Sequence, residues 1–104
     1  MLERFKPKPE DATRVSVESL REVVSAIFEK MGVSGEDANE AADVLTMTDL
    51  RGVETHGVSN MLRAYVDQYN SGQVNPRPNW QIERETPGTA VINAGRGLGI
   101  ILGR

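Results

Sequence analysis

The chain has 104 residues, 38% of them hydrophobic, which suits one domain with a modest core. It contains no cysteine and a single histidine, which excludes disulfide frameworks, thiolate metal sites and histidine-rich metal clusters. A formal net charge of −3 argues against nucleic-acid binding, and no apolar run approaches the ~20 residues that span a bilayer. The charged N-terminus is not a secretory signal. We therefore expect a soluble, cytoplasmic protein that has no metal site and binds neither nucleic acid nor membrane.

The chain divides by composition into three parts. Residues 1–14 are expected to form an extended leader, because Pro7 and Pro9 disfavour helix at the residue before each of them. Residues 15–72 predict a three-helix subdomain. Ser16, Ser34 and Thr55 are the expected N-caps of its helices, which should end near Gly32, Arg51 and Ser71-Gly72.

Each predicted helix carries apolar residues at three-to-four spacing, which is typical of one buried face. Small alanines in the second helix would permit close approach to a neighbour. The residues expected to point inward are Leu20, Val23, Val24, Ile27, Phe28 and Met31, then Ala38, Ala41, Ala42, Leu45 and Leu50, and finally Val58, Met61, Leu62, Tyr65, Val66 and Tyr69.

Residues 73–104 predict a connector, a β-hairpin and the start of a truncated helix. Residues 80–85 alternate as in a half-buried strand, Pro87-Gly88 marks a turn, and residues 89–93 form the second strand. Trp80 is expected to pack against the helices. The fold class is therefore mainly α with a C-terminal β-hairpin. Because the chain stops just after an apolar cluster, we interpret it as a piece of a longer protein.

His56 is the first candidate for chemistry. If Thr55 caps the third helix, His56 lies just inside it, where the partial positive charge of the helix N-terminus disfavours the imidazolium. A neutral imidazole can accept or return a proton, which is general acid–base work. Asn60, Arg63 and Asp67 would share its helical face. Spacing alone favours a histidine that is merely exposed to solvent, so both interpretations stay open.

The glycines from Gly95 to Gly103 are the second candidate. They follow a predicted strand, as does the dinucleotide fingerprint G-x-G-x-x-G, but the third glycine stands at Gly103 and not at position 102. We therefore interpret the segment as a tight turn between strand and helix. Tyr65 and Tyr69, which could stack on a base, are expected to belong to the core.

The run DLRGVETHG at residues 49–57, followed by VSNMLRAYV and NSG, resembles the N-terminal part of the type-2 malate/L-lactate dehydrogenase family, which includes ureidoglycolate and sulfolactate dehydrogenases. The resemblance extends over most of residues 15–104. It implies that the chain is the three-helix N-terminal subdomain of a larger α/β dehydrogenase fold distinct from the Rossmann type.

The resemblance also implies an activity. Family members are oxidoreductases that use NAD or NADP, act on small 2-hydroxy or 2-keto acids and form homodimers. Their catalytic histidine carries over to His56, with Thr55 in the place usually held by serine. Where many members have an arginine that contacts the substrate carboxylate, this chain has Asn60, and Arg63 one turn further on is a physically possible substitute.

The family's cofactor-binding residues, and the acidic partner of its histidine, have no counterpart in these 104 residues. We therefore expect an N-terminal segment of an NAD(P)-dependent 2-hydroxy-acid dehydrogenase that is inactive as an isolated chain. The alternative is a non-enzymatic helical module that dimerises or docks through Ile100, Ile101 and Leu102.

Overall fold

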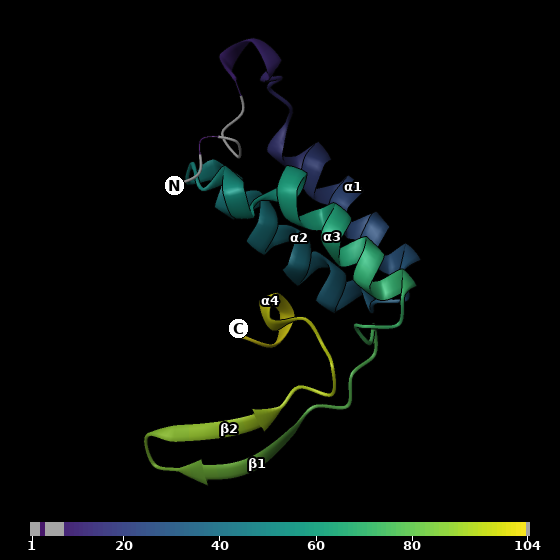
Figure 1. The fold of residues 1–104 in the computed structure, drawn as a ribbon, viewed down its shortest axis with the longest axis vertical. Coiled ribbons are helices and arrows are strands. Elements are labelled where there is room, and N and C mark those ends of the chain that lie inside the picture. Colours follow the sequence, from purple (N-terminus) through teal and green to yellow (C-terminus); the bar gives the residue numbers. More distant parts are fainter. Residues whose placement is uncertain (1–2, 4–7, 104) are drawn as a thin grey trace.

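The computed structural model describes residue 3 and residues 8–103. Three long helices, α1 (Val17–Lys30), α2 (Gly35–Leu50) and α3 (Val58–Asn70), pack side by side. An antiparallel hairpin of β1 (Gln81–Thr86) and β2 (Thr89–Asn93) projects from one end of the bundle, and the short helix α4 (Gly99–Leu102) returns to it (Figure 1). The prediction of a mainly helical chain with a C-terminal hairpin is confirmed.

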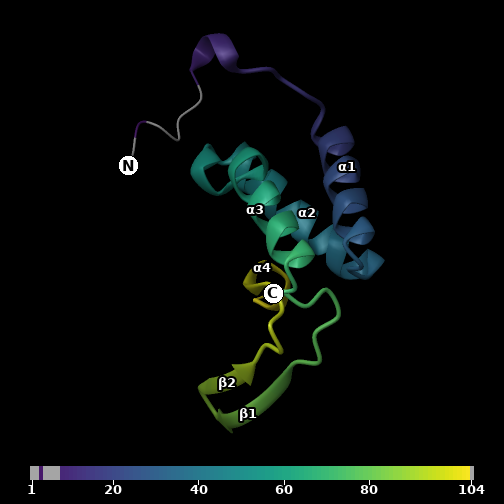
Figure 2. The same ribbon diagram turned by 45° about the vertical axis from the view of Figure 1, so that its right-hand side comes forward.

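Residues 8–14 of the leader lie at the opposite end of the molecule from the hairpin (Figure 2). Within its described part, Pro9–Asp11 form a single 3-10 turn, η2, and the residues on either side are exposed. The rest of the extended leader predicted over residues 1–14 lies largely outside the described residues.

The first two helices begin and end where the sequence predicts. The Ser16 hydroxyl accepts a hydrogen bond from the Ser19 amide at 3.3 Å, and the Ser34 hydroxyl accepts one from the Asp37 amide at 3.2 Å. Each bond satisfies an amide that has no partner inside its helix. At the other end of α1, Gly32 adopts a φ of +98°, a conformation that glycine enters without the steric cost of a β-carbon.

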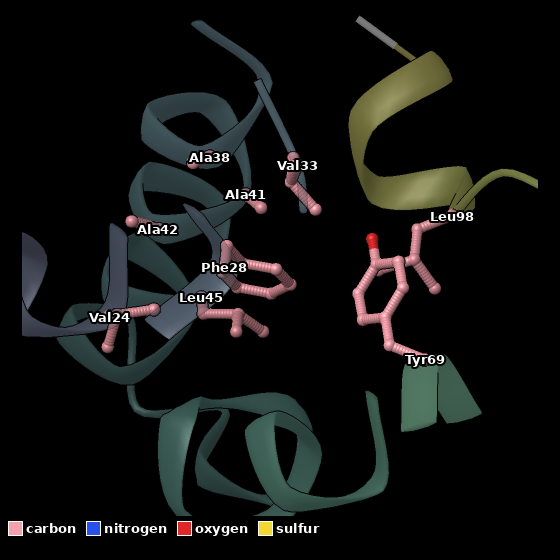
Figure 3. Packing of buried hydrophobic residues seen from close by; sticks show 9 residues of the cluster. All are labelled: Val24, Phe28, Val33, Ala38, Ala41, Ala42, Leu45, Tyr69 and Leu98. Atoms are coloured by element: carbon pink, nitrogen blue, oxygen red, sulfur yellow. The ribbon is translucent and has the colours of Figure 1, made fainter. Parts of the chain in front are cut away.

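The core is built around α2, which contacts α1, α3 and α4. Its three buried alanines leave room for the larger side chains of α1 to lie against the helix backbone. Phe28 fills that space and meets the Tyr69 ring edge-on, with the ring centroids 6.2 Å apart (Figure 3). The buried apolar cluster comprises Val24, Phe28, Val33, Ala38, Ala41, Ala42, Leu45, Tyr69 and Leu98.

Two arginines tie the C-terminal segment to the ends of the helices. The Arg77 Nε donates to the Gly32 carbonyl at 2.7 Å, and an Arg96 guanidinium nitrogen donates to the Gly72 carbonyl at 3.2 Å. Both carbonyls lie just past the C-terminus of a helix, where unpaired oxygens and the helix dipole favour a cation. Arg96 holds a φ of +64°, and its own carbonyl accepts from the Asn75 amide at 2.9 Å.

The expected burial of the hairpin is wrong. Every residue of β1 and β2 is exposed, because the hairpin points away from the helices and neither of its faces meets them. Trp80, just before β1, is 51% exposed and lines a small hollow with Asp37 of α2 and Ile101 of α4. Two inward assignments in the helices also fail. Val23 is 56% exposed because it lies about 100° around the helix from Val24, which faces α2. Leu50, at the end of α2, borders an open hollow.

Burial raises the pKa of Tyr69 to about 12, with smaller contributions from the charge of Asp37 and from Tyr65. In the unfolded chain a tyrosine loses its proton near pH 10, so the folded state retains a proton that the unfolded state releases. We therefore expect the contribution of Tyr69 to the free energy of unfolding to be constant below pH 10 and to fall between pH 10 and pH 12. Urea unfolding across this range measures the fall, and Tyr69→Phe should remove most of it. An equal fall in Tyr69→Phe would assign the effect to another group.

Candidate functional site

The N-terminus of α3 is capped by a side chain from another helix. The Asp49 carboxylate, in the last turn of α2, accepts a hydrogen bond from the Val58 amide at 2.9 Å through Oδ2. Gly57 is the residue at the cap position, and it has no side chain to do this. The prediction that Thr55 caps α3 is therefore wrong: the helix begins at Val58, three residues later, because its cap comes from Asp49.

Gly57 is buried and lies directly against the Asp49 carboxylate. A β-carbon built on Gly57 would overlap Oδ1 of Asp49. The φ of Gly57 is −88°, which any residue can adopt. Glycine is required here because there is no space for a β-carbon. Asp49 and Gly57 thus form one packed contact between the end of α2 and the start of α3.

His56 lies in a three-residue 3-10 turn, η3 (Glu54–His56), immediately before this contact. His56 is therefore not part of the first turn of α3. We expected the partial positive charge of the helix N-terminus to disfavour the imidazolium, and that expectation assumed that His56 lies inside the helix, which is wrong. The ring is exposed, and its Nδ1 lies 2.8 Å from the Thr55 hydroxyl oxygen. A hydroxyl can either donate to or accept from an imidazole nitrogen, so Thr55 can pair with Nδ1 in each protonation state of the ring. Nε2 is then the ring nitrogen left to exchange a proton with a ligand.

The two residues expected to contact substrate lie on α3. The Asn60 side-chain amide donates to the Glu54 carbonyl at 2.8 Å, so its Nδ2 holds η3 in place. Arg63 is exposed one turn further along the helix. Contact of either residue with a substrate stays a prediction.

A hollow of about 410 Å³ lies between the leader and the helices. Asp11, Asp49 and Glu54 contribute carboxylates to its lining, and Leu20 and Leu50 are among its apolar residues. Three carboxylates repel an anionic ligand. His56 does not belong to this lining, so the hollow and the imidazole are distinct features of the same end of the bundle.

The glycine-rich turn after β2 does not fit a dinucleotide phosphate. Two of its amides are used internally: the Gly95 amide donates to Asn93 Oδ1 at 3.0 Å, and the Gly97 amide donates to the Ala94 carbonyl at 2.9 Å. A β-carbon on Gly97 would lie 2.7 Å from a ring carbon of Pro78, so this glycine permits packing against the connector. The interpretation as a tight turn agrees with this geometry.

Over residue 3 and residues 8–103, no cluster of three or more histidine, aspartate and glutamate side chains has the arrangement needed to hold a metal ion. Nor does any helix in this part of the chain have the length and hydropathy to cross a bilayer.

Comparison with known proteins places this chain in a family. Residues 15–104 match the malate/L-lactate dehydrogenase family, and the chain belongs to it. A malate dehydrogenase of Pyrococcus horikoshii is 44% identical over 94 residues, which are 90% of this chain and 26% of that protein. An L-sulfolactate dehydrogenase of Methanocaldococcus jannaschii is 36% identical over 87 residues, which are 84% of this chain and 25% of that protein.

Solved structures agree with the sequence matches. The structure of malate dehydrogenase from Pyrococcus horikoshii OT3 superposes with a TM-score of 0.83 over 88% of this chain and 26% of its own. That of sulfolactate dehydrogenase from Methanocaldococcus jannaschii gives 0.81 over 86% of this chain and 26% of its own. The chain corresponds to the N-terminal part of these dehydrogenases and spans about a quarter of their length.

Sequence reasoning missed the role of Asp49. Capping rules examine the residue just before a helix, whereas Asp49 lies nine residues before the amide that it caps. The available signal was the string from Asp49 to Gly57, in which the first and last residues turn out to touch.

We expect Gly57→Ala to lower the free energy of unfolding by about 2 kcal/mol, because the added carbon must push the Asp49 carboxylate off the Val58 amide. Urea unfolding measures the change. Gly35→Ala is the matched control: its β-carbon would meet only Glu29 Oε1 at 3.9 Å, so stability should be unchanged or slightly higher. In an Asp49→Ala background, Gly57→Ala should cost less. Equal behaviour of the two glycine variants would contradict the packed contact.

Proposed function

We propose that this chain supplies the proton-transfer histidine of an oxidoreductase that interconverts 2-hydroxy acids and 2-keto acids. The observation that carries the proposal is the exposed His56 ring, whose Nδ1 is paired with Thr55 while Nε2 is left for a ligand. Support comes from the family match, and the relatives named above are malate and sulfolactate dehydrogenases.

The pairing with Thr55 suits proton transfer in both directions. During oxidation, Nε2 would take the proton of the substrate hydroxyl while the hydride on the same carbon would pass to a bound redox cofactor, and the imidazolium keeps its Nδ1–H directed at the Thr55 oxygen. During reduction, Nε2–H returns the proton to the carbonyl oxygen. Because Thr55 fixes the ring through Nδ1 in both states, the same nitrogen gives and receives the proton.

The redox cofactor of this proposal is a nicotinamide, NAD or NADP, as the family suggests; one ureidoglycolate dehydrogenase relative from Escherichia coli carries NAD(+) in its name. The glycine-rich turn does not offer a phosphate cradle, so no residue of the described chain is assigned to holding this cofactor. We further propose that the active enzyme is a cytoplasmic homodimer. A chain of this length alone is proposed to have no dehydrogenase activity.

The alternative of a non-enzymatic docking module receives no specific support from the structure. It depended on an uncovered apolar cluster at the C-terminal end. Ile100, Ile101 and Leu102 are instead half-buried, and the two isoleucines pack against the core.

The test uses a chimera in which residues 15–104 replace the matching segment of the Pyrococcus horikoshii malate dehydrogenase. We expect His56→Ala to lower kcat for malate oxidation by about 10²–10⁴-fold, the usual contribution of a general acid–base group. The control is Glu22→Ala, an exposed carboxylate on α1, which should leave kcat unchanged. A loss below about tenfold in a folded chimera would falsify the assignment.

Arg63 is proposed to bind the substrate carboxylate, because a guanidinium matches a carboxylate in charge and geometry. In the same chimera, Arg63→Gln should raise KM for malate about tenfold or more and change kcat less, as expected when ground-state binding is lost. Arg84→Gln, which removes an exposed arginine from β1, is the matched control. If both variants leave KM unchanged, the carboxylate is bound elsewhere.

A further inference from the structure

The turn that carries His56 is held on both sides by side chains from outside it. On the side of Glu54, the Asn60 amide donates to the backbone carbonyl at 2.8 Å. On the side of Gly57, the Asp49 carboxylate accepts from the Val58 amide at 2.9 Å and fills the space against Gly57. The backbone path through His56 is therefore fixed at two points.

We infer that Asp49 is a positioning residue for His56, an inference that rests on the proposed function of that histidine. Asp49 does not touch the ring. It fixes the backbone two residues further along, at Val58, and the contact with Gly57 leaves no room for that backbone to approach α2 more closely. The location of the imidazole relative to the bundle depends on this contact.

Asp49 holds a fixed position because it belongs to a helix that is anchored in the core. This helix is α2, and its inward face, which includes Leu45 and Thr46, is almost completely buried. The Thr46 hydroxyl is satisfied within the helix by the Ala42 carbonyl at 2.8 Å. The end of α2 is thus anchored in the core, and the carboxylate transmits this anchoring to the start of α3.

The chemistry of the contact requires a short, forked acceptor. One oxygen must reach the Val58 amide while the rest of the group packs against Gly57. Asparagine has the same shape and keeps one acceptor oxygen, whereas alanine removes the acceptor and leaves a gap. Asp49→Asn is therefore the conservative variant and Asp49→Ala the disruptive one.

The test is a double-mutant cycle in the dehydrogenase chimera described above, with Asp49→Ala and His56→Ala made singly and together. We expect Asp49→Ala to lower kcat for malate about tenfold to a hundredfold while His56 is present, since misplacing a catalytic group by about 1 Å costs about 10²-fold. KM should change less than about threefold. With His56→Ala already in place, Asp49→Ala should lower kcat less than about twofold, because there is no imidazole left to misplace.

Three further variants make the cycle decisive. Asp49→Asn should restore kcat to within about threefold of the parent chimera, because it keeps shape and acceptor. Glu22→Ala should leave kcat unchanged in both backgrounds. If Asp49→Ala does not yield folded protein, Asp49→Ser replaces it in the cycle, since serine keeps a polar group but is too short to span the contact.

The outcomes separate this inference from the proposed function. Equal losses from Asp49→Ala with and without His56 would show that Asp49 serves the fold alone, and the inference would be overturned. An unchanged kcat in Asp49→Ala beside a large loss in His56→Ala would overturn the inference and leave the proposed function standing. An unchanged kcat in His56→Ala would overturn both.

Discussion

The hydrogen bond from the Val58 amide to the Asp49 carboxylate joins two helices across a seven-residue connection. A carboxylate at a helix N-terminus satisfies an unpaired amide and opposes the partial positive charge there, which together are worth about 0.5–2 kcal/mol. That energy is small beside the core. Its importance is geometric, because the connection it braces contains η3 and His56.

The bundle makes this bracing possible because α2 is its central element. Alanines on the inward face let α1 approach closely, so that Phe28 and Leu45 fill the interior and the axis of α2 is fixed from several sides. The same helix ends in Asp49. The 16 residues of α2 therefore contribute buried side chains to the core along most of the helix, and Asp49 in its last turn fixes the start of α3.

Local patterns were sufficient to predict most of the bundle. Serine caps and three-to-four apolar spacing located α1 and α2, because both signals act within a few residues of the helix that they mark. The start of α3 was not predictable in this way, since its cap depends on a contact formed only when α2 and α3 pack together. Period-two alternation located the hairpin strands but not their exposure, because burial depends on what covers a strand and alternation does not specify it.

The same limit applies to the candidate site. The string ending in Thr55, His56 and Gly57 made the histidine a candidate through a resemblance. The 2.8 Å pairing with Thr55 and the use of Asn60 as a brace for Glu54 follow only from the three-dimensional structure. A residue that binds substrate and a residue that braces η3 would both be polar and would both lie at a position such as Asn60. Spacing alone does not distinguish them.

The neutral side chain at Asn60 has a consequence for substrate binding. With its Nδ2 engaged by the Glu54 carbonyl, it supplies no positive charge to a carboxylate ligand. In the proposed function Arg63, which is exposed one turn further along the same helix, would supply that charge. No ion pair joins Arg63 to Asp67, four residues further on and also described, and an exposed pair at that spacing would be worth only about 0.2–1 kcal/mol, so Asp67 would not prevent the guanidinium from turning to a substrate. Bidentate binding of a carboxylate by arginine adds two charge-assisted hydrogen bonds, which outweigh that attraction.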